Sequence, residues 1–157
     1  MIVLAVAVVL AVGPERLWER FGPADLGDVE FATLVRRDQP NDALACLPEY
    51  CEAKIDIPAP VIAKPQADVF LAVQQALAGE PGLEQVAGDA AAGTLRYVQR
   101  SKLMRFPDTI SVQVMPASGG GSAVLLYSRS QLGKSDFGVN RARLERWIGL
   151  IQAAAQK

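Results

Sequence analysis

Two segments of the chain carry apolar residues at helical spacing. In residues 66–79 these residues recur three and four positions apart, so they share one face of a helix: Val69, Phe70, Val73, Ala76 and Leu77. A glycine and a proline follow and end this helix. A second stripe predicts a C-terminal helix that begins after Ser135 and Asp136, either of which can cap its first turn. Its members are Val139, Leu144, Trp147, Ile148, Ile151 and Ala155.

Between the two helices, apolar and polar residues alternate with the period of two that is typical of strands. The alternation is clear in 94–100, 109–115 and 122–130 and weaker in 83–87. The glycine-rich stretch 116–121 joins the last two strands and predicts an antiparallel hairpin. The order helix, strands, helix predicts an α+β fold. We expect a two-layer sandwich in which an antiparallel sheet of about four strands is covered on one face by two helices.

The chain begins with an uninterrupted apolar run, residues 1–12. It is shorter than the roughly 20 residues that cross a bilayer as a helix, and it lacks the basic start of a signal peptide. We still expect residues 1–21 to form an N-terminal membrane anchor or signal segment, with a buried element of the domain as the alternative. Arg16 and Arg20 follow the run, and the positive-inside rule would keep the rest of the chain cytoplasmic.

Residues 22–60 are acidic and rich in proline, without a sustained period. They predict an extended segment laid over the domain, with a short strand around Val29–Leu34 and a tight turn in Arg37–Ala43. Residues 61–63 predict another strand. The expected organisation is therefore a membrane or signal segment (1–21), an extended segment (22–60) and an α+β domain (61–157).

The only cysteines, Cys46 and Cys51, lie in a short loop within the extended segment. Their spacing favours a structural disulfide, which forms in oxidising compartments. Two reduced thiols, or redox or metal chemistry, remain as alternatives. A disulfide favours a domain that faces the periplasm or the cell exterior, against the direction that Arg16 and Arg20 indicate.

The chain contains no histidine, which excludes a Ser-His-Asp or Cys-His catalytic site within it. Two cysteines without histidine make a poor metal site, and the glycines of 116–121 lack the Lys-Ser/Thr of a phosphate loop. We therefore expect no metal and no cofactor. Residues 94–146 carry nine basic groups against three acidic ones. That excess favours an anionic partner but is too small to predict nucleic-acid binding.

Arg, Asp and Ser concentrate where the predicted strands 94–100 and 122–130 end, at one edge of the sheet. Arginine binds carboxylate or phosphate with two parallel hydrogen bonds, and a helix N-terminus adds to the attraction. A structural network of ion pairs is the alternative, as is catalysis by an Asp base or a Ser nucleophile. The candidate binding residues are Arg100, Ser101, Arg105, Asp108, Arg129, Ser130, Ser135, Asp136, Asn140 and Arg141.

Two motifs in this region resemble a known family. Residues 100–108 read Arg-Ser-Lys-Leu-Met-Arg-Phe-Pro-Asp, and residues 128–143 contain Gly-Lys-Ser-Asp-Phe-Gly-Val-Asn-Arg-Ala-Arg. Over roughly 34–151 the chain resembles the bacterial and plastid "domain of unknown function 1499" family, from which it departs by an extra Ser130. The resemblance implies attachment to a membrane or export, and it implies no activity, substrate or catalytic residue.

We expect a membrane-anchored envelope domain that faces the periplasm or cell exterior and acts as a non-catalytic binding or structural module. Its partners would be the membrane, through the N-terminal segment, and an anionic small molecule, a lipid headgroup or an envelope protein. The alternative is a hydrolase or transferase with an Asp or Ser at the same edge.

Overall fold

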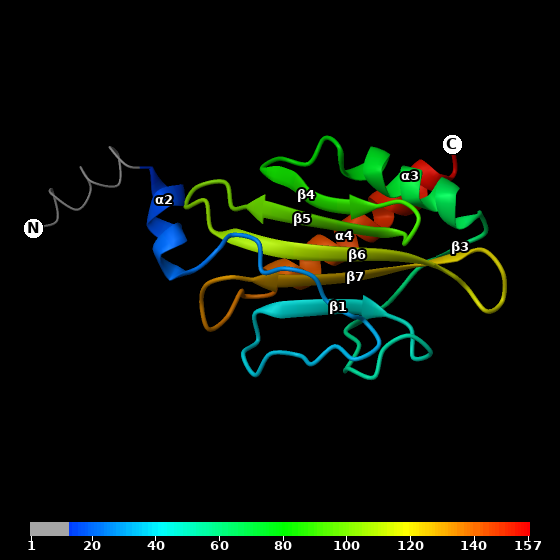
Figure 1. Ribbon diagram of the computed structural model, residues 1–157, viewed down its shortest axis with the longest axis horizontal. Helices are drawn as coiled ribbons and strands as arrows, with labels where there is room; N and C mark the ends of the chain where they lie inside the picture. The colour runs from blue at the N-terminus through cyan, green and yellow to red at the C-terminus, as the bar shows by residue number, and fades with distance from the viewer. Residues whose placement is uncertain (1–12) are drawn as a thin grey trace, which may run out of the picture.

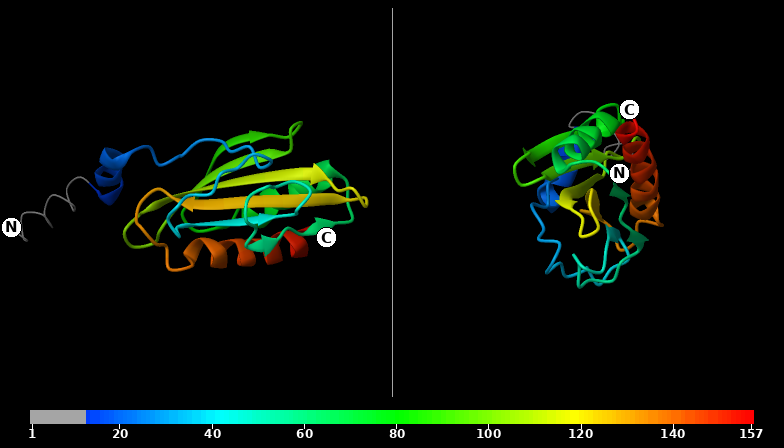
Figure 2. Two further views of the ribbon diagram at one scale, coloured as in Figure 1. Left: turned by 90° about the horizontal axis from the view of Figure 1, so that it is seen from below. Right: turned by 90° about the vertical axis from the view of Figure 1, so that its right-hand side faces the viewer.

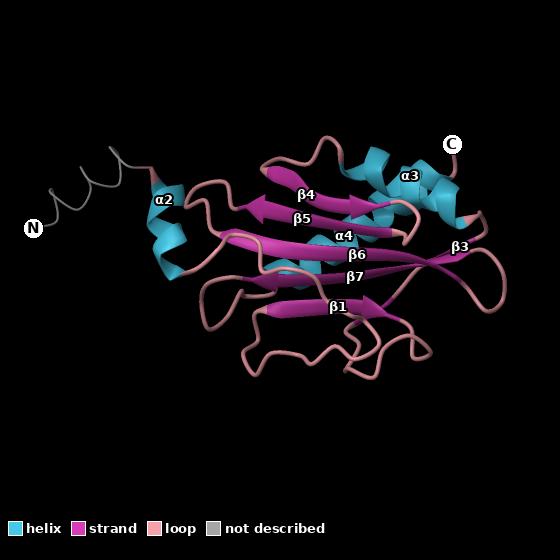
Figure 3. Cartoon of the chain, viewed as in Figure 1, coloured by secondary structure: helices cyan, strands magenta, loops and turns pink. Residues whose placement is uncertain are grey.

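A computed structural model describes residues 13–157. The predicted membrane or signal segment falls largely on residues 1–12, which lie outside the described residues. The chain forms an open sheet of seven strands (Figure 1, Figure 3). The strands are β1 (Asp42–Cys46), β2 (Ile57–Pro58), β3 (Val61–Ile62), β4 (Leu83–Asp89), β5 (Thr94–Arg100), β6 (Pro107–Pro116) and β7 (Ser122–Ser130). The helices are α2 (Pro14–Trp18), the 3-10 helix η1 (Glu19–Phe21), α3 (Gln66–Leu77) and α4 (Val139–Ala155). Within residues 13–157 every helix is too short or too polar to span a bilayer.

The predicted α+β class is confirmed, and the sheet is larger than predicted. Strands β4 to β7 form the expected antiparallel meander, in the order β7-β6-β5-β4. The extended segment adds β1, which is antiparallel to β7, and β2, which is parallel to β1, so the sheet is mixed. Strand β3 pairs with the start of β7, as the strand predicted in 61–63.

The strand predicted around Val29–Leu34 is wrong, because that backbone is irregular and only Phe31 is fully buried there. The strand that joins the sheet is β1, which begins inside the turn predicted for 37–43. Its sequence Asp-Ala-Leu-Ala-Cys is buried on both faces and therefore shows no alternation of polar and apolar residues. A strand enclosed on both sides loses the periodic signal that identifies a half-exposed one.

The first core lies between the sheet and the two long helices, α3 and α4, which pack against each other on one face (Figure 2). Trp147 of α4 is fully buried and meets the ring of Tyr97 edge to face, with centroids 5.9 Å apart. Val124 and Leu126 of β7 point to the same side. Because these positions alternate along the strand, the helix face of β7 continues to Ser128 and Ser130.

A second core covers the opposite face of the sheet, where no helix was predicted. Leu125 and Tyr127 of β7 pack there against Phe31 and Leu44. The irregular chain before and after β1 closes over them (Figure 2). β7 therefore buries both of its faces, and the extended segment takes the place of a second helical layer.

Arginines hold the extended segment on this second face. Arg96 of β5 pairs with Asp25 at 2.9 Å and also with Asp28. Further along the chain, Arg36 pairs with Asp42 at 2.6 Å and with Asp56 at 2.8 Å. Burial raises the pKa of Asp42, but the hydrogen bonds from Arg36 and from the Tyr127 hydroxyl outweigh burial and hold that pKa below its usual value.

The predicted disulfide is confirmed. Cys46, at the end of β1, and Cys51 lie at disulfide distance, with Cα atoms 6.3 Å apart. Both are buried in the second core. The bond closes a short loop beside the edge of the sheet, so it restricts the unfolded chain only locally.

Removing the disulfide should lower the free energy of unfolding by about 2 kcal/mol, the value that loop-closure entropy gives for so short a loop. Urea unfolding of Cys46→Ala/Cys51→Ala against the wild-type chain measures this difference. Unfolded wild-type chain isolated from cells should show reactive thiols only after reduction. An unchanged urea midpoint together with two reactive thiols before reduction would contradict the assignment.

Replacing Asp42 by Asn should make stability less sensitive to acid. Because the pKa of Asp42 is lower in the folded chain than in the unfolded one, its carboxylate stabilises the fold above about pH 4 and loses that effect as pH falls through the folded pKa. The difference in unfolding free energy between wild type and Asp42→Asn should therefore be largest at neutral pH and shrink in acid. The exposed Asp38→Asn is the matched control, and a difference that stays constant from neutral to acid pH would refute the role of Asp42.

Candidate functional site

The candidate residues lie at one end of the sheet, where β5 and β7 end and β6 and α4 begin, but they do not form a single site. Asp108, Ser130, Asp136 and Asn140 belong to a buried network. Arg100 and Ser101 line an open cleft. The remaining candidates, Arg105, Arg129, Ser135 and Arg141, each make separate local contacts.

The buried network is centred on Arg143, which the sequence analysis did not single out. Its guanidinium donates hydrogen bonds from all three nitrogen atoms. Nε donates to Gln99 Oε1 at 2.6 Å, and Nη2 donates to Asp108 Oδ2 at 2.6 Å. Nη1 donates to Ser128 Oγ at 2.8 Å and to Asn140 Oδ1 at 2.7 Å. One arginine of α4 thereby joins side chains from β5, β6 and β7.

Asn140 extends the network to the turn before β1. It is fully buried, and its amide nitrogen lies 2.9 Å from Ser130 Oγ, 2.7 Å from Asp136 Oδ2 and 3.1 Å from the backbone oxygen of Asn41. Asp136 Oδ2 also accepts the backbone N–H of Asn140 at 2.9 Å. The predicted capping of the last helix is thus made by Asp136, while Ser135 Oγ accepts the N–H of Phe137 just before the helix.

The network leaves little capacity for catalysis. Asp108 is bound by Arg143, and Asp136 accepts backbone and side-chain hydrogen bonds at the start of α4. Ser128 and Ser130 are buried within the network, where a substrate would not reach them. In the part of the chain from residue 13 onward, no cluster of acidic or cysteine side chains could hold a metal ion. Hydrolase or transferase activity remains a prediction that this geometry does not favour.

Ser128 and Ser130 of β7 point to the helix face of the sheet, where Arg143 lies. Arg129 lies between them in the strand and therefore points to the opposite face. Its Nη2 donates to the backbone oxygens of Leu26 at 2.9 Å and Gly27 at 2.7 Å, and its guanidinium lies 5.8 Å from the centre of the Tyr127 ring. Burial lowers the pKa of Arg129. Its contacts fasten the extended segment to the sheet.

Arg105 and Arg141 also have local partners. Arg105 Nε lies 2.7 Å from Glu15 Oε1 of α2, and this hydrogen bond lowers the pKa of Glu15. Arg141 is exposed on α4 and pairs with Glu145 one turn later. Such a surface pair contributes well under 1 kcal/mol.

The open cleft lies between the β5–β6 loop and α4 and has a volume of ≈ 580 Å³. It is lined by Pro81, Gln99, Arg100, Ser101, Lys102, Asp108, Val139, Ala142, Arg143 and Arg146. These include four cations and one carboxylate. Among residues 13–157, neither Arg100 nor Lys102 has an ion-pair partner.

Arg146 is held at the cleft wall by Glu80. The two side chains share hydrogen bonds of 2.5 and 2.6 Å, and Trp147 Nε1 donates to the same carboxylate at 3.0 Å. The hydrogen bond from Arg146 is the main reason that the pKa of Glu80 is lowered, and it outweighs the effect of burial. Glu80 therefore stays ionised and offsets the charge of Arg146, which leaves Arg100 and Lys102 as the surplus charge of the cleft.

The spacing of Arg143 along the last helix indicates that it is buried, but a stripe defined by apolar residues alone does not include an arginine. The buried positions of α4 include Asn140, Arg143, Leu144 and Trp147, at steps of three, one and three residues. Asn140 and Arg143 therefore lie on the apolar stripe, where a polar residue must find buried partners. Val139, which was predicted to belong to the stripe, is exposed at the cleft instead.

Removing the partner of Arg143 should destabilise the fold far more than removing a surface partner. Asp108→Ala leaves a buried, unpaired guanidinium and should lower the free energy of unfolding by about 3–5 kcal/mol. Arg141→Ala on the same helix should change it by less than about 0.5 kcal/mol. Chemical unfolding of both variants measures this contrast, and similar losses in the two would contradict a central role for the Arg143–Asp108 pair.

Two solved structures match this chain at low sequence identity. The crystal structure of protein CV1439 from Chromobacterium violaceum is 12% identical, with a TM-score of 0.45, over 74% of this chain and 98% of that one. TTHA0849 from Thermus thermophilus is 14% identical, with a TM-score of 0.32, over 73% of this chain and 90% of the other. No curated protein matches the chain.

A family model matches residues 35–151, which include β1 to β7, α3 and most of α4. The match contains the whole buried network around Arg143 and every residue that lines the cleft. It confirms the family that the two sequence motifs indicated. The chain belongs to the DUF1499 family, whose members are described as proteins of unknown function.

Proposed function

We propose that this protein is a non-catalytic, membrane-attached module that binds an anionic group in the cleft between the β5–β6 loop and α4. The ligand class is a phosphate or carboxylate group. The observation that carries the proposal is the surplus of positive charge in an open cleft, where Arg100 and Lys102 have no ion-pair partner within residues 13–157.

The cleft suits an anion because its two paired arginines form a fixed wall beside two cations without an ion-pair partner in the described residues. Arg143 is fixed by four hydrogen bonds, and Arg146 is fixed by Glu80. Asp108 and Glu80 offset the charges of these two arginines, so they form a fixed wall and the charge left for a ligand is that of Arg100 and Lys102. Lys102 supplies an ammonium group that can bind a phosphate or carboxylate, and Arg100, at the end of β5, adds its positive charge beside the cleft. Ser101 lines the same wall and can donate a hydroxyl hydrogen bond.

Membrane attachment rests on the first 21 residues and on the disulfide. The apolar run 1–12 leads directly into α2, which lies beside the cleft end of the domain (Figure 1). The disulfide between Cys46 and Cys51 supports a location in an oxidising compartment, such as the periplasm or the cell exterior.

Inorganic phosphate should bind the wild-type chain, and loss of the two surplus charges should weaken that binding. In Arg100→Ala/Lys102→Ala the dissociation constant should rise at least about tenfold, because a charged hydrogen bond contributes about 1.5–3 kcal/mol. Isothermal titration calorimetry of the full chain in a neutral detergent, at fixed ionic strength, measures the constant.

Arg141→Ala is the matched control, since it removes an arginine of α4 that does not line the cleft. It should leave phosphate binding unchanged. The proposal fails if phosphate binds no better than chloride, or if Arg141→Ala weakens binding as much as the double variant does.

A further inference from the structure

Large apolar side chains are exposed at the end of the domain that carries the cleft. Phe137 is 95% exposed and Leu103 is 87% exposed. Phe21, Met104 and Val139 are also exposed nearby along the same segments. We name these five residues the apolar end. Exposing several large apolar side chains together is unfavourable in water and is typical of a surface that meets another apolar phase.

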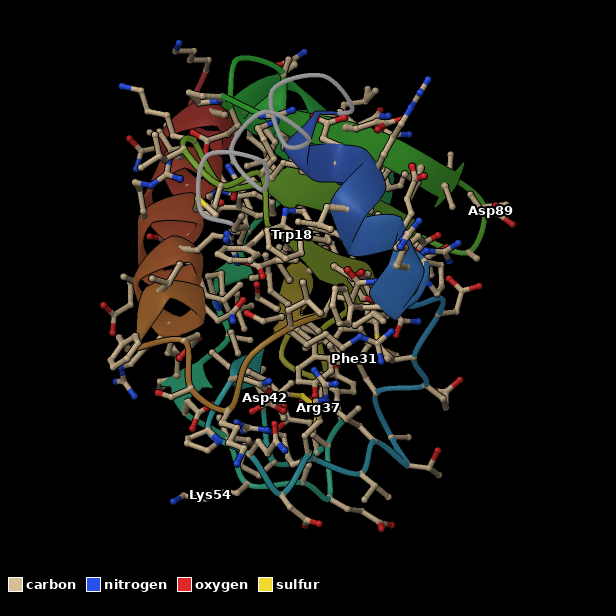
Figure 4. All side chains as sticks on the ribbon, turned by 90° about the vertical axis from the view of Figure 1, so that its left-hand side faces the viewer. Trp18, Phe31, Arg37, Asp42, Lys54 and Asp89 are labelled. Carbon is tan, nitrogen blue, oxygen red and sulfur yellow. A yellow bond between two sulfur atoms is a disulfide. The ribbon has the colours of Figure 1, made fainter. Side chains whose placement is uncertain are left out.

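Three segments bring these residues to one end of the molecule. The β5–β6 loop carries Leu103 and Met104, the β7–α4 loop carries Phe137, and α2 with η1 ends at Phe21. Figure 4 looks onto this end, with α2 in front and the start of α4 and the preceding loop beside it. Val139 lines the cleft together with Ser101 and Lys102, so the two loops form opposite rims of one opening.

The β5–β6 loop and α2 are joined as one unit. Trp18 Nε1 donates to the backbone oxygen of Met104 at 2.6 Å, and the rings of Trp18 and Phe106 lie 4.5 Å apart. Arg105, between these two loop residues, pairs with Glu15. The exposed Leu103 and Met104 are therefore held in place by contacts on the inner side of the loop.

The β7–α4 loop holds Phe137 outward at some cost to the backbone. Phe137 has a φ of 53°, a left-handed conformation that bulky residues rarely adopt. The same side chain is almost completely exposed, so two features of Phe137 are unfavourable: its backbone conformation and the contact of its ring with water. Burial of the ring in an apolar medium would offset one of them.

Positive charge surrounds the apolar end. Arg16, Arg20, Lys102 and Lys134 are exposed on the same three segments, and none has an ion-pair partner in the described part of the chain. The acidic groups of these segments are fewer. Glu15 is bound to Arg105, Asp136 caps α4, and Glu19 is the exposed carboxylate. Apolar residues rimmed by Lys and Arg match the interface of an anionic bilayer.

We propose that the folded domain rests with its apolar end on the surface of an anionic phospholipid bilayer, with Leu103 and Phe137 inserted among the acyl chains. The position of the chain's start supports a bilayer as the occupant. Residues 1–12 are apolar and precede Gly13 at this same end, so any part of that run in a membrane brings the end close to the lipid surface. The inference goes beyond the proposed function, because lipid contact does not require an anion in the cleft.

Fluorescent probes at the apolar end should report an apolar surrounding only when anionic lipid is present. Both native cysteines are paired, so Leu103→Cys or Phe137→Cys adds a single thiol for labelling. In vesicles of phosphatidylcholine with phosphatidylglycerol, emission should shift to the blue, and nitroxide groups on the acyl chains should quench it. Ser118→Cys, in the exposed turn at the other end of β6 and β7, is the matched control and should stay unquenched.

The charged rim can be tested apart from the cleft with Arg20→Gln/Lys134→Gln, since neither residue lines the cleft. This variant should remove the difference in quenching between anionic and pure phosphatidylcholine vesicles. About 1 M salt should do the same in the wild-type background, because it shortens the screening length to about 3 Å. Hydrogen exchange on the unlabelled full chain is a second measurement, in which residues 101–106 and 133–138 should gain protection with anionic vesicles while 117–121 do not.

The proposal is overturned if probes at positions 103 and 137 are quenched no more than the probe at 118. A blue shift that is already complete without lipid would also overturn it, because a protein surface, either a second copy or the chain's own first residues, would then cover the apolar end. Phosphate binding in the cleft is measured without vesicles, so the two proposals can fail independently.

Discussion

The buried ion pair between Arg143 and Asp108 fixes the position of the last helix, α4, on the sheet. A buried guanidinium is costly unless every nitrogen finds a partner, and partners come from three adjacent strands and from Asn140. This requirement can be met at only one rotation and one longitudinal position of α4. Apolar packing of Leu144 and Trp147 tolerates small shifts, whereas the hydrogen bonds do not. The network therefore fixes the rotation and the longitudinal position of α4 on the sheet, which apolar contacts alone would not fix.

The same position of α4 on the sheet also places the cleft and the apolar end. Asn140 bonds to the turn before β1, and Asp136 accepts the backbone N–H of Asn140, so the chain is held on both sides of Phe137 and Val139. Phe137 and Val139 lie between these fixed points and face outward. Across the opening, Trp18 and Glu15 hold the β5–β6 loop. Each rim is thus supported by contacts that leave its outer side chains unused for folding.

The sequence predicted the two long helices, the meander and the disulfide because each has a local signal. The alternation along β5 and the helical spacing around Trp147 follow from one buried face and one more exposed face, whereas β7 buries both of its faces and has the glycine-rich turn before it as a further local signal. The signal fails for β1, where both faces are buried. The cover over Leu125 and Tyr127 was predicted as an extended segment laid over the domain, but irregular chain has no period that tells which face it covers. The signal also fails for Arg143, since periodicity treats an arginine as a solvent-facing residue. Only its spacing from Asn140 and Trp147 shows that it points inward.

Arginines at this end of the molecule divide into two kinds, and the division explains why sequence alone could not separate structure from binding. Arg143, Arg129 and Arg105 each have specific partners that join distant segments. Arg100 lines the opening without an ion-pair partner among residues 13–157, beside a wall in which Asp108 and Glu80 balance Arg143 and Arg146. The partners of the first kind offset the cost of burying each guanidinium. Charge left unpaired in a cleft contributes little to folding, and for Arg100 the proposed anionic ligand would give that charge a partner.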